Sequence, residues 1–263
     1  MTPVFLEAVG LAAPGLPSWT QGRATLRGET AFAAEPLSPH TPAMLPLNEH
    51  RRATPVVRLA FRAAEDALQG TALPAANLAT VFASSDADQA IIHRICLALT
   101  ATPRLISPTD FHNSVHNAAA GYWSIAAGAR TASTTISAYD GTFAAGLVEA
   151  CSQVLVDGCD ALLVAFDLPG PEPLNPGRSM AHPAAAALVL TRQRTARSMA
   201  ALICDSTSAA ETKLEQSALE QLRLGNPAAR ALPLMQALAQ QRFGSVVLPM
   251  GLGANLRVEL RSP

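Results

Sequence analysis

The chain has 263 residues, of which 49% are apolar and only 15% are charged, and its formal net charge is −1. A chain of this length can bury one large α/β core. Its near-neutral charge excludes the broad basic surface that binds nucleic acid or anionic membranes. The charged fraction is well below the roughly 25% of an average soluble protein, so we expect a partner to cover part of the apolar surface.

The N-terminal segment, MTPVFLEAVGLAAPG, carries Glu7 and has no Arg or Lys before Arg23, which is not the pattern of a signal peptide. No apolar run approaches the roughly 18 residues that a membrane-spanning helix needs. We therefore expect a cytoplasmic protein without a membrane span. The cysteines are Cys96, Cys151, Cys159 and Cys204. Their wide spacing and the absence of a CxxC motif favour buried thiols over a disulfide framework or a zinc site.

Apolar runs that alternate with turn residues predict a layered α/β sheet. Strands are expected at residues 4–11, 78–84, 131–138, 161–166, 184–191 and 245–249. Helices are expected at residues 49–69, 87–100, 117–129 and 142–157, and in the tail up to Arg223 and over 227–241. Residues 14–48 hold many prolines and little periodicity, so we expect them to be irregular.

The stretch from Thr131 to Pro169, TASTTISAYDGTFAAGLVEACSQVLVDGCDALLVAFDLP, resembles the nucleophile region of β-ketoacyl synthases in the thiolase-like superfamily. In that family a buried strand ends in a Ser-Ala-Cys turn, and a helix begins directly after it. The helix N-terminus then favours a thiolate and stabilises an acyl oxyanion. The segment Met180 to Arg192 resembles the family's later Ala-rich strand, and the resemblance covers residues 1–195.

This resemblance implies an α/β fold that corresponds to the N-terminal half of a ketosynthase, with a mixed sheet in α-β-α layers and without the C-terminal half. It implies a ketosynthase-like domain at residues 1–200. Residues 201–263 are expected to form a short C-terminal extension that packs on the same unit.

Two departures from the family pattern bear on activity. Tyr139 follows Ser137 and Ala138 where the condensing enzymes have Cys, and a phenol with a pKa of about 10 is a poor nucleophile for acyl transfer. The family's catalytic histidines lie in its C-terminal half, whereas this sequence has no histidine after His182. The chain is therefore expected not to be an enzyme on its own, and no cofactor is expected.

A condensing-enzyme fold with its nucleophile replaced resembles the chain-length factors, and the shortened form is similar to the small subunit of aryl polyene biosynthesis. This implies a heterodimer, or a dimer of heterodimers, with a full-length β-ketoacyl synthase that works on an acyl carrier protein. The chain would stabilise that synthase and limit acyl chain elongation. The strand at 131–138 would pair with the partner, and the segment 111–123 would line the acyl tunnel. The residues expected at this interface and tunnel are Phe111, His112, Asn113, Val115, His116, Asn117, Tyr122, Trp123, Thr131, Ser133, Thr135, Ser137 and Tyr139.

Phe111 is our candidate for a side chain that reaches into the partner's tunnel, with an ordinary core phenylalanine as the alternative. His112 and His116 have the i, i+4 spacing that places two side chains on one helix face. No third ligand accompanies them, so we expect no metal site, but interface or local backbone hydrogen bonds. Asp140 is expected to cap the helix that follows it.

The alternative function is a small independent acyltransferase or thioesterase that acts on carrier-bound acyl groups. It would use Ser137, Tyr139 or His116, and it would need a nucleophile and a base within hydrogen-bond reach. The sequence contains no G-x-S-x-G nucleophile elbow around Ser137.

Overall fold

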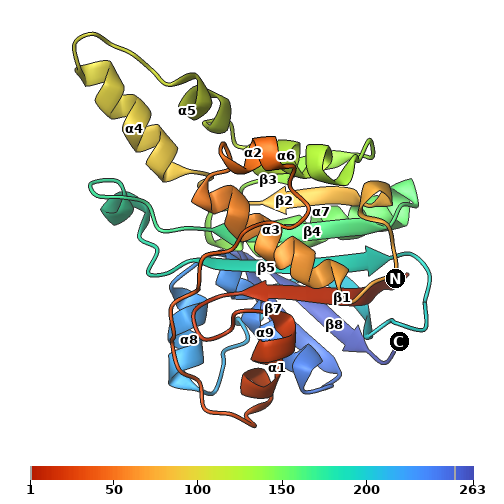
Figure 1. The fold of residues 1–263 in the computed structure, drawn as a ribbon. Coiled ribbons are helices and arrows are strands. Elements are labelled where there is room, and N and C mark those ends of the chain that lie inside the picture. The colour runs from red at the N-terminus through yellow and green to blue at the C-terminus, as the bar shows by residue number, and fades with distance from the viewer. Residues whose placement is uncertain (1, 252) are drawn as a thin grey trace.

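The computed structural model describes residues 2–251 and 253–263. Within them, an eight-stranded sheet has the order β3-β2-β4-β5-β1-β6-β8-β7 and carries helices on both faces (Figure 1). The strands are β1 (Val4–Ala12), β2 (Ala79–Ala83), β3 (Ser133–Ile136), β4 (Ala161–Asp167), β5 (Ala184–Thr191), β6 (Ala200–Thr207), β7 (Gly244–Gly251) and β8 (Ala254–Arg261).

Helices lie on both faces of the sheet (Figure 1). They are α1 (Trp19–Arg27), α2 (Leu47–His50), α3 (Pro55–Leu68), α4 (Gln89–Thr100), α5 (Pro108–Asn113), α6 (Ala118–Ala127), α7 (Thr142–Ser152), α8 (Ser217–Leu224) and α9 (Leu232–Ala239). A π-helical turn over Gln153–Asp157 extends α7. None of the helices in the described part of the chain is both long enough and apolar enough to cross a membrane.

The central strands are buried on both faces of the sheet. Leu163 and Ala165 of β4 face a core shared with α1, α7 and α9, whereas Leu162 and Val164 face a second core shared with α3 and α6. Strands buried on both sides read as continuous apolar runs, which is why ALLVAF and AAAALVLT stand out in the sequence. Strands β2, β3 and β4 are parallel to one another, and β5 runs antiparallel to β4 and β1. The predicted mixed sheet in α-β-α layers is confirmed.

Several predicted elements need correction. Residues 14–48 are not wholly irregular, because α1 forms there: the Ser18 side chain accepts from the Gln21 N–H, and Gly28 ends the helix in the left-handed conformation. The helix expected from residue 49 begins at Pro55, with Thr54 as its N-cap. Helix α5 and strands β6 and β8 were not predicted.

Residues 201–263 continue the sheet of the preceding part of the chain. Strand β6 pairs antiparallel with β1 and β8, and β8 pairs with β7, while α8 and α9 lie on the face that also carries α7 (Figure 1). The predicted boundary at residue 200 falls at the start of β6. A Cβ atom at Gly141 would lie only 2.5 Å from the Met250 carbonyl oxygen, so the tail packs directly against the turn that precedes α7.

Candidate functional site

The turn between β3 and α7 holds Tyr139 in a constrained conformation. Its φ is +52°, in the left-handed region that residues other than glycine rarely adopt. The Thr142 hydroxyl donates to the Tyr139 carbonyl at 2.6 Å and accepts from the Ala138 N–H at 3.1 Å. A residue in such a conformation costs free energy, so it persists only where the surrounding structure holds it. Residues of this kind cluster at functional sites. The turn therefore holds the Tyr139 side chain in a defined position at the N-terminal end of α7.

The Tyr139 side chain lies on the surface, 63% exposed. The Arg178 guanidinium lies 3.7 Å from the centroid of its ring, which is a cation–π arrangement. Arg178 also donates to Asp140 Oδ1 and to Ser85 Oγ, both at 2.8 Å. The turn is thus joined through Arg178 to the end of β2.

Asp140 has a different role from the predicted helix cap. Gly141 occupies the N-cap position of α7, and no side-chain cap bond forms there. The Asp140 carboxylate instead accepts from Arg178 at 2.8 Å and from Arg230 at 3.4 Å. The Asp140 carboxylate thus joins two guanidinium groups in charge-assisted contacts instead of capping α7.

The tail contributes a buried ion network beside this turn. Arg223 of α8 is 2% exposed and donates to both carboxylate oxygens of Glu220, at 2.7 and 2.9 Å, and to Glu211 at 2.8 Å. Arg230, which reaches Asp140, also lies 3.9 Å from Glu211. The tail and the turn before α7 are therefore held together by a continuous set of charged side chains.

A cavity of about 320 Å³ opens beside Tyr139. Residues 138–141 line one side, and Glu211, Pro249 near the end of β7 and Asn255 near the start of β8 line the other. In the described residues, no hydrogen bond joins Tyr139, Ser137 and His116 to one another: Ser137 Oγ donates to the Ser85 carbonyl, and His116 Nε2 lies 3.0 Å from the Ser84 carbonyl.

Asp167 at the end of β4 is a buried carboxyl group that the sequence analysis missed. Its Oδ1 accepts from Ser84 Oγ at 2.9 Å and from the Ser85 N–H at 2.8 Å, while the described residues supply no hydrogen-bond partner for its Oδ2. Burial raises the pKa of Asp167 from 3.8 to about 7, although these hydrogen bonds oppose the shift. The group therefore titrates near neutral pH, close to the residues that anchor Arg178.

This titration predicts a pH-dependent stability. The raised pKa means that the folded state binds the Asp167 proton more tightly than the unfolded state, so its stabilising contribution is complete in acid and is lost as the pH rises toward 7. Relative to Asp167→Asn, the free energy of unfolding of the wild type should fall by about 3 kcal/mol between about pH 5 and about pH 8. Chemical denaturation at several pH values measures this difference. The exposed Asp157→Asn is the control, and a pH-independent difference for Asp167→Asn would contradict the assignment.

The two histidines do not share a helix face. Helix α5 ends at Asn113, so His112 lies on it and His116 follows it. The His112 ring stacks edge-on against Tyr122, with 6.0 Å between centroids, whereas His116 points to the Ser84 carbonyl. The prediction that both histidines lie on one helix face is therefore wrong, because helix α5 ends between the two residues. Across the described residues, no cluster of three or more His, Cys, Asp or Glu side chains could hold a metal ion.

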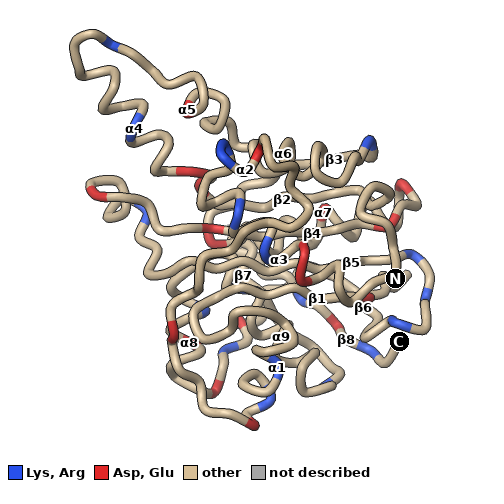
Figure 2. The backbone as a smooth tube through the Cα atoms, in the orientation of Figure 1, with Lys and Arg blue, Asp and Glu red and all other residues tan. Residues whose placement is uncertain are grey.

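Strand β3 is the edge of the sheet beside β2 (Figure 1). The Ala132 carbonyl accepts from the Thr80 N–H of β2, and the Ile136 carbonyl accepts from the N–H of Ser84, which follows β2 directly. Because alternate residues of a strand direct their backbone groups to opposite sides, those of Ser133 and Thr135 face away from the sheet. No charged residue occurs from Thr131 to Tyr139, as the uncharged tube at β3 shows (Figure 2). Thr131 and Ser133, at the start of this stretch, are exposed.

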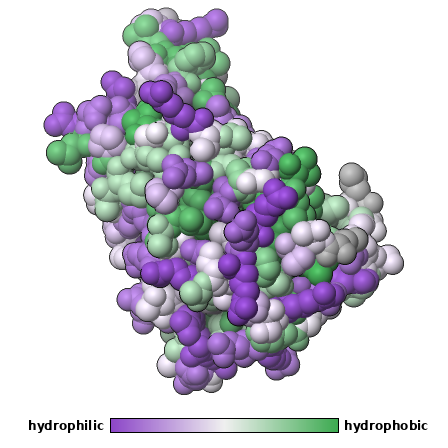
Figure 3. Space-filling model, turned by 90° about the vertical axis from the view of Figure 1, so that its right-hand side faces the viewer, coloured by the Kyte–Doolittle hydropathy of each residue, from purple (hydrophilic) through white to green (hydrophobic). Residues whose placement is uncertain are grey.

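Helices α4 and α5 form an arm, residues 89–113, that projects from the body of the molecule (Figure 1). Arg94 and Asp110 pair at 2.9 Å and join its two helices. Apolar side chains remain exposed over the arm, and the projection at the top of Figure 3 carries patches of hydrophobic surface. The exposed apolar residues of this region are Ile92, Leu97, Leu99, Leu105, Ile106, Phe111 and, just beyond it, Val115.

The residues expected at the interface divide into two groups. Phe111 is 69% exposed, so it is not the core phenylalanine of the alternative interpretation. His112, Val115 and Asn117 are also exposed. Trp123 is fully buried against Phe61 and Phe82, with 5.2 and 6.3 Å between ring centroids. Asn113 and Tyr122 are buried as well. These three side chains pack within the chain itself.

Comparison with known proteins defines the class of this fold. The model of the family described as beta-ketoacyl synthase, N-terminal domain, matches residues 19–247. The chain belongs to this family. A search of curated proteins finds no match.

Solved structures are similar over nearly the whole chain. One is a chain of the complex of the ketosynthase ApeO with its chain length factor ApeC from Xenorhabdus doucetiae, with a TM-score of 0.73, 24% identity and coverage of 98% of this chain and 100% of that one. A second is a chain of AntDE:AntF, a type II polyketide synthase acyl-carrier protein in complex with its ketosynthase, with a TM-score of 0.74, 14% identity and coverage of 100% and 99%.

A β-ketoacyl synthase from Burkholderia phymatum STM815 is similar with a TM-score of 0.58 and 16% identity, over 92% of this chain and 71% of that one. At these identities the similarities establish the fold. This chain is thus a ketosynthase-like fold that corresponds to only part of that longer synthase.

Proposed function

We propose that this chain is a non-catalytic chain-length factor that pairs with a full-length β-ketoacyl synthase in aryl polyene biosynthesis. The observation that carries the proposal is Tyr139. It occupies a strained turn before a helix N-terminus, the geometry that presents a nucleophile, yet it supplies a phenol stacked on Arg178. A phenol at this position cannot supply the thiolate that acyl transfer needs. In this proposal the turn has a structural role, and the partner carries out the acyl transfer.

The free edge of β3 supports a partner that adds a strand. An uncovered edge presents unpaired N–H and C=O groups, and proteins commonly cover or charge such edges to prevent aggregation. Here the edge residues Ser133 and Thr135 are uncharged and lie on a strand with its outer side open. Pairing with the equivalent strand of a ketosynthase of the same fold would continue the sheet across the two subunits.

The arm supports a partner with an apolar surface. Contiguous exposed apolar side chains mark contact sites, and an aromatic side chain such as Phe111 is typical of interface anchors. A ketosynthase that grows an acyl chain needs an apolar tunnel with a defined end. In our proposal Phe111 reaches that tunnel from the arm and limits elongation. The acyl carrier protein binds to the ketosynthase, not to this chain alone.

The division of labour between the subunits can be tested with the reconstituted complex. Acyl extension should be abolished when the nucleophilic cysteine of the ketosynthase is replaced by alanine, and it should be unchanged by Tyr139→Phe in this chain, because the phenol oxygen does no chemistry. Carrier-bound products are measured by mass spectrometry. Turnover of acyl-carrier thioesters by this chain alone, lost on Ser137→Ala or Tyr139→Phe, would contradict the proposal and support an independent acyltransferase or thioesterase.

The role of Phe111 gives a separate prediction. Phe111→Ala should release longer acyl products from the complex without loss of assembly, because truncation of the ring removes the side chain that ends the tunnel. Leu224→Ala is the matched control, since Leu224 is an exposed apolar residue of α8 outside the proposed interface. Product length is measured by mass spectrometry of the carrier-bound chains. An unchanged product from an intact Phe111→Ala complex would exclude Phe111 as the limiting residue.

A further inference from the structure

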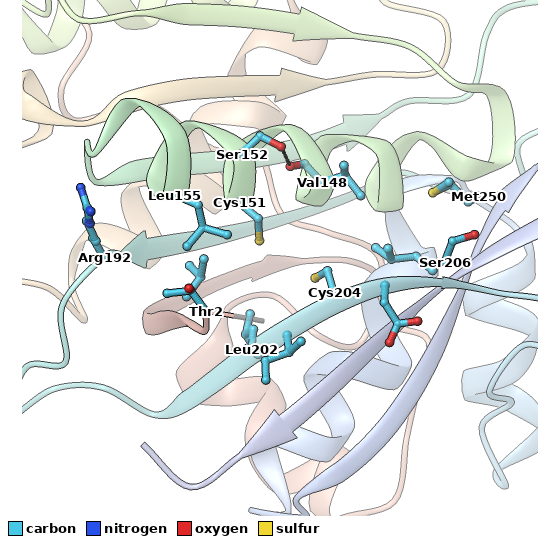
Figure 4. A pocket seen from close by; sticks show the side chains of 14 residues that line it. Thr2, Val148, Cys151, Ser152, Leu155, Arg192, Leu202, Cys204, Ser206 and Met250 are labelled. Carbon is cyan, nitrogen blue, oxygen red and sulfur yellow. Dashed lines mark hydrogen bonds between the residues drawn. The ribbon is translucent and has the colours of Figure 1, made fainter.

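Two cysteines that are 53 positions apart in the sequence face one another across a pocket. Cys151 lies on α7 and Cys204 on β6, and both sulfurs point into the space between the helix and the strand (Figure 4). This α7–β6 pocket has a volume of about 520 Å³ and is otherwise lined mainly by apolar side chains, including Val148, Leu155 and Leu202. Both cysteines are free thiols in the structure.

The two thiols are chemically unequal. The interaction with Cys204, together with burial, raises the pKa of Cys151, whereas the interaction with Cys151 lowers the pKa of Cys204. Cys151 is buried and Cys204 is partly exposed. A thiolate is the nucleophile in cysteine oxidation, and sensor cysteines combine a lowered pKa and solvent access with a second thiol nearby. Cys204 has the features of the attacking thiol, and Cys151 has those of the resolving thiol.

We propose that Cys204 and Cys151 form a peroxide-sensitive thiol pair that closes to a disulfide between β6 and α7. The Cys204 thiolate attacks one oxygen of hydrogen peroxide, the O–O bond breaks, and the hydroxide released takes up a proton to become water. The Cys151 sulfur then attacks the Cys204 sulfenic acid, the S–O bond breaks, and water leaves with the Cys151 proton. Two thiols are oxidised by two electrons, and one peroxide is reduced to two waters.

The disulfide would connect the helix that follows the Tyr139 turn to the tail. Helix α7 begins three residues after Tyr139, and β6 is the first strand of the tail's part of the sheet. A bond across the α7–β6 pocket fixes the distance between these elements, and a thiol reductant reverses it. This property does not depend on the proposed partnership with a ketosynthase.

The experiment uses the full chain, exposed to a small excess of hydrogen peroxide, alkylated and digested without reduction. Trypsin leaves Cys151 in the peptide 131–178 and Cys204 in the peptide 198–213, so their disulfide joins two separate peptides. Fragmentation distinguishes Cys151 from Cys159. We expect the Cys151–Cys204 disulfide as the main product, its loss on treatment with dithiothreitol, and a higher Tm for the oxidised chain.

Two serine variants test the order of the steps. Cys151→Ser should leave a Cys204 sulfenic acid that dimedone traps, at least about tenfold faster than it labels Cys159, whose pKa is raised by burial. Cys204→Ser should abolish the disulfide. Exposed Cys96 reports general oxidation in the same sample. Oxidation of Cys96 or Cys159 with no Cys151–Cys204 disulfide in the folded wild-type chain would overturn the proposal, and this readout requires no variant to fold.

Discussion

Thr135→Pro should weaken assembly with the ketosynthase about a hundredfold while leaving this chain folded. The carbonyls of Ala132, just before β3, and of Ile136 point toward β2, so by alternation Thr135 directs its N–H toward the free edge. Proline removes that donor, and its ring obstructs an incoming strand without removing a bond to β2. The unpaired acceptor on the partner strand and the clash with the ring together should cost about 3 kcal/mol of binding free energy, which is a roughly hundredfold larger dissociation constant.

Thr135→Ala is the matched control, because it shortens the side chain but keeps the N–H. Co-purification and titration with the tagged ketosynthase measure assembly, and circular dichroism with thermal melting confirms that each variant is folded. If folded Thr135→Pro binds as tightly as Thr135→Ala, the β3 edge is not the pairing surface.

Arg223→Met should destabilise the chain by about 3–5 kcal/mol, the usual cost of removing one partner from a buried ion pair. The two carboxylates that Arg223 binds, those of Glu220 and Glu211, would remain without their shared cation. The Glu220 hydrogen bond and charge are well matched to Arg223, as the lowered pKa of Glu220 shows. The loss should be visible in chemical denaturation near neutral pH.

The control for Arg223→Met is the double variant with Glu220→Leu. It removes the nearer uncompensated carboxylate, so part of the lost stability should return. A single variant that loses less than about 1 kcal/mol would match a solvent-exposed ion pair instead. In that case the network would not be what holds α8 beside the turn.

The central part of the sheet was predictable because its strands are buried on both faces. The continuous apolar runs of β4 and β5 identify them directly. Strands β6 and β8 escaped prediction because each carries charged or polar residues in its sequence, such as Asp205 and Arg257. Their strand character comes from pairing with each other and with β1. Helix α1 escaped because the prolines on either side of it obscured the Ser18 and Gly28 caps.

The candidate site was predictable only where one residue carried the signal. Tyr139 stands out in the sequence because it follows Ser137 and Ala138 at the end of a strand. Arg178 does not, since it comes from an irregular segment 39 positions later and reaches Tyr139 only through the fold. Phe111 and Trp123 look alike as aromatic residues of one segment. Core packing alone separates the exposed ring from the buried one.

The cysteines show the same limit. Spacing along the chain argued against any pairing, and the structure brings Cys151 and Cys204 together because α7 and β6 border one pocket. The buried carboxyl of Asp167 does have a signal in the sequence, because it is an acidic residue at the end of an otherwise fully apolar strand.

Co-expression with a full-length ketosynthase tests the central claim most directly. The chain, with an affinity tag, is produced together with the ketosynthase encoded nearest to it in the genome, and the mass of the purified assembly is measured by native mass spectrometry. We predict a complex with equal numbers of the two chains, either a heterodimer or a dimer of heterodimers, that extends carrier-bound acyl groups. A chain that purifies folded and alone, with the ketosynthase fully active without it, would contradict the proposed role.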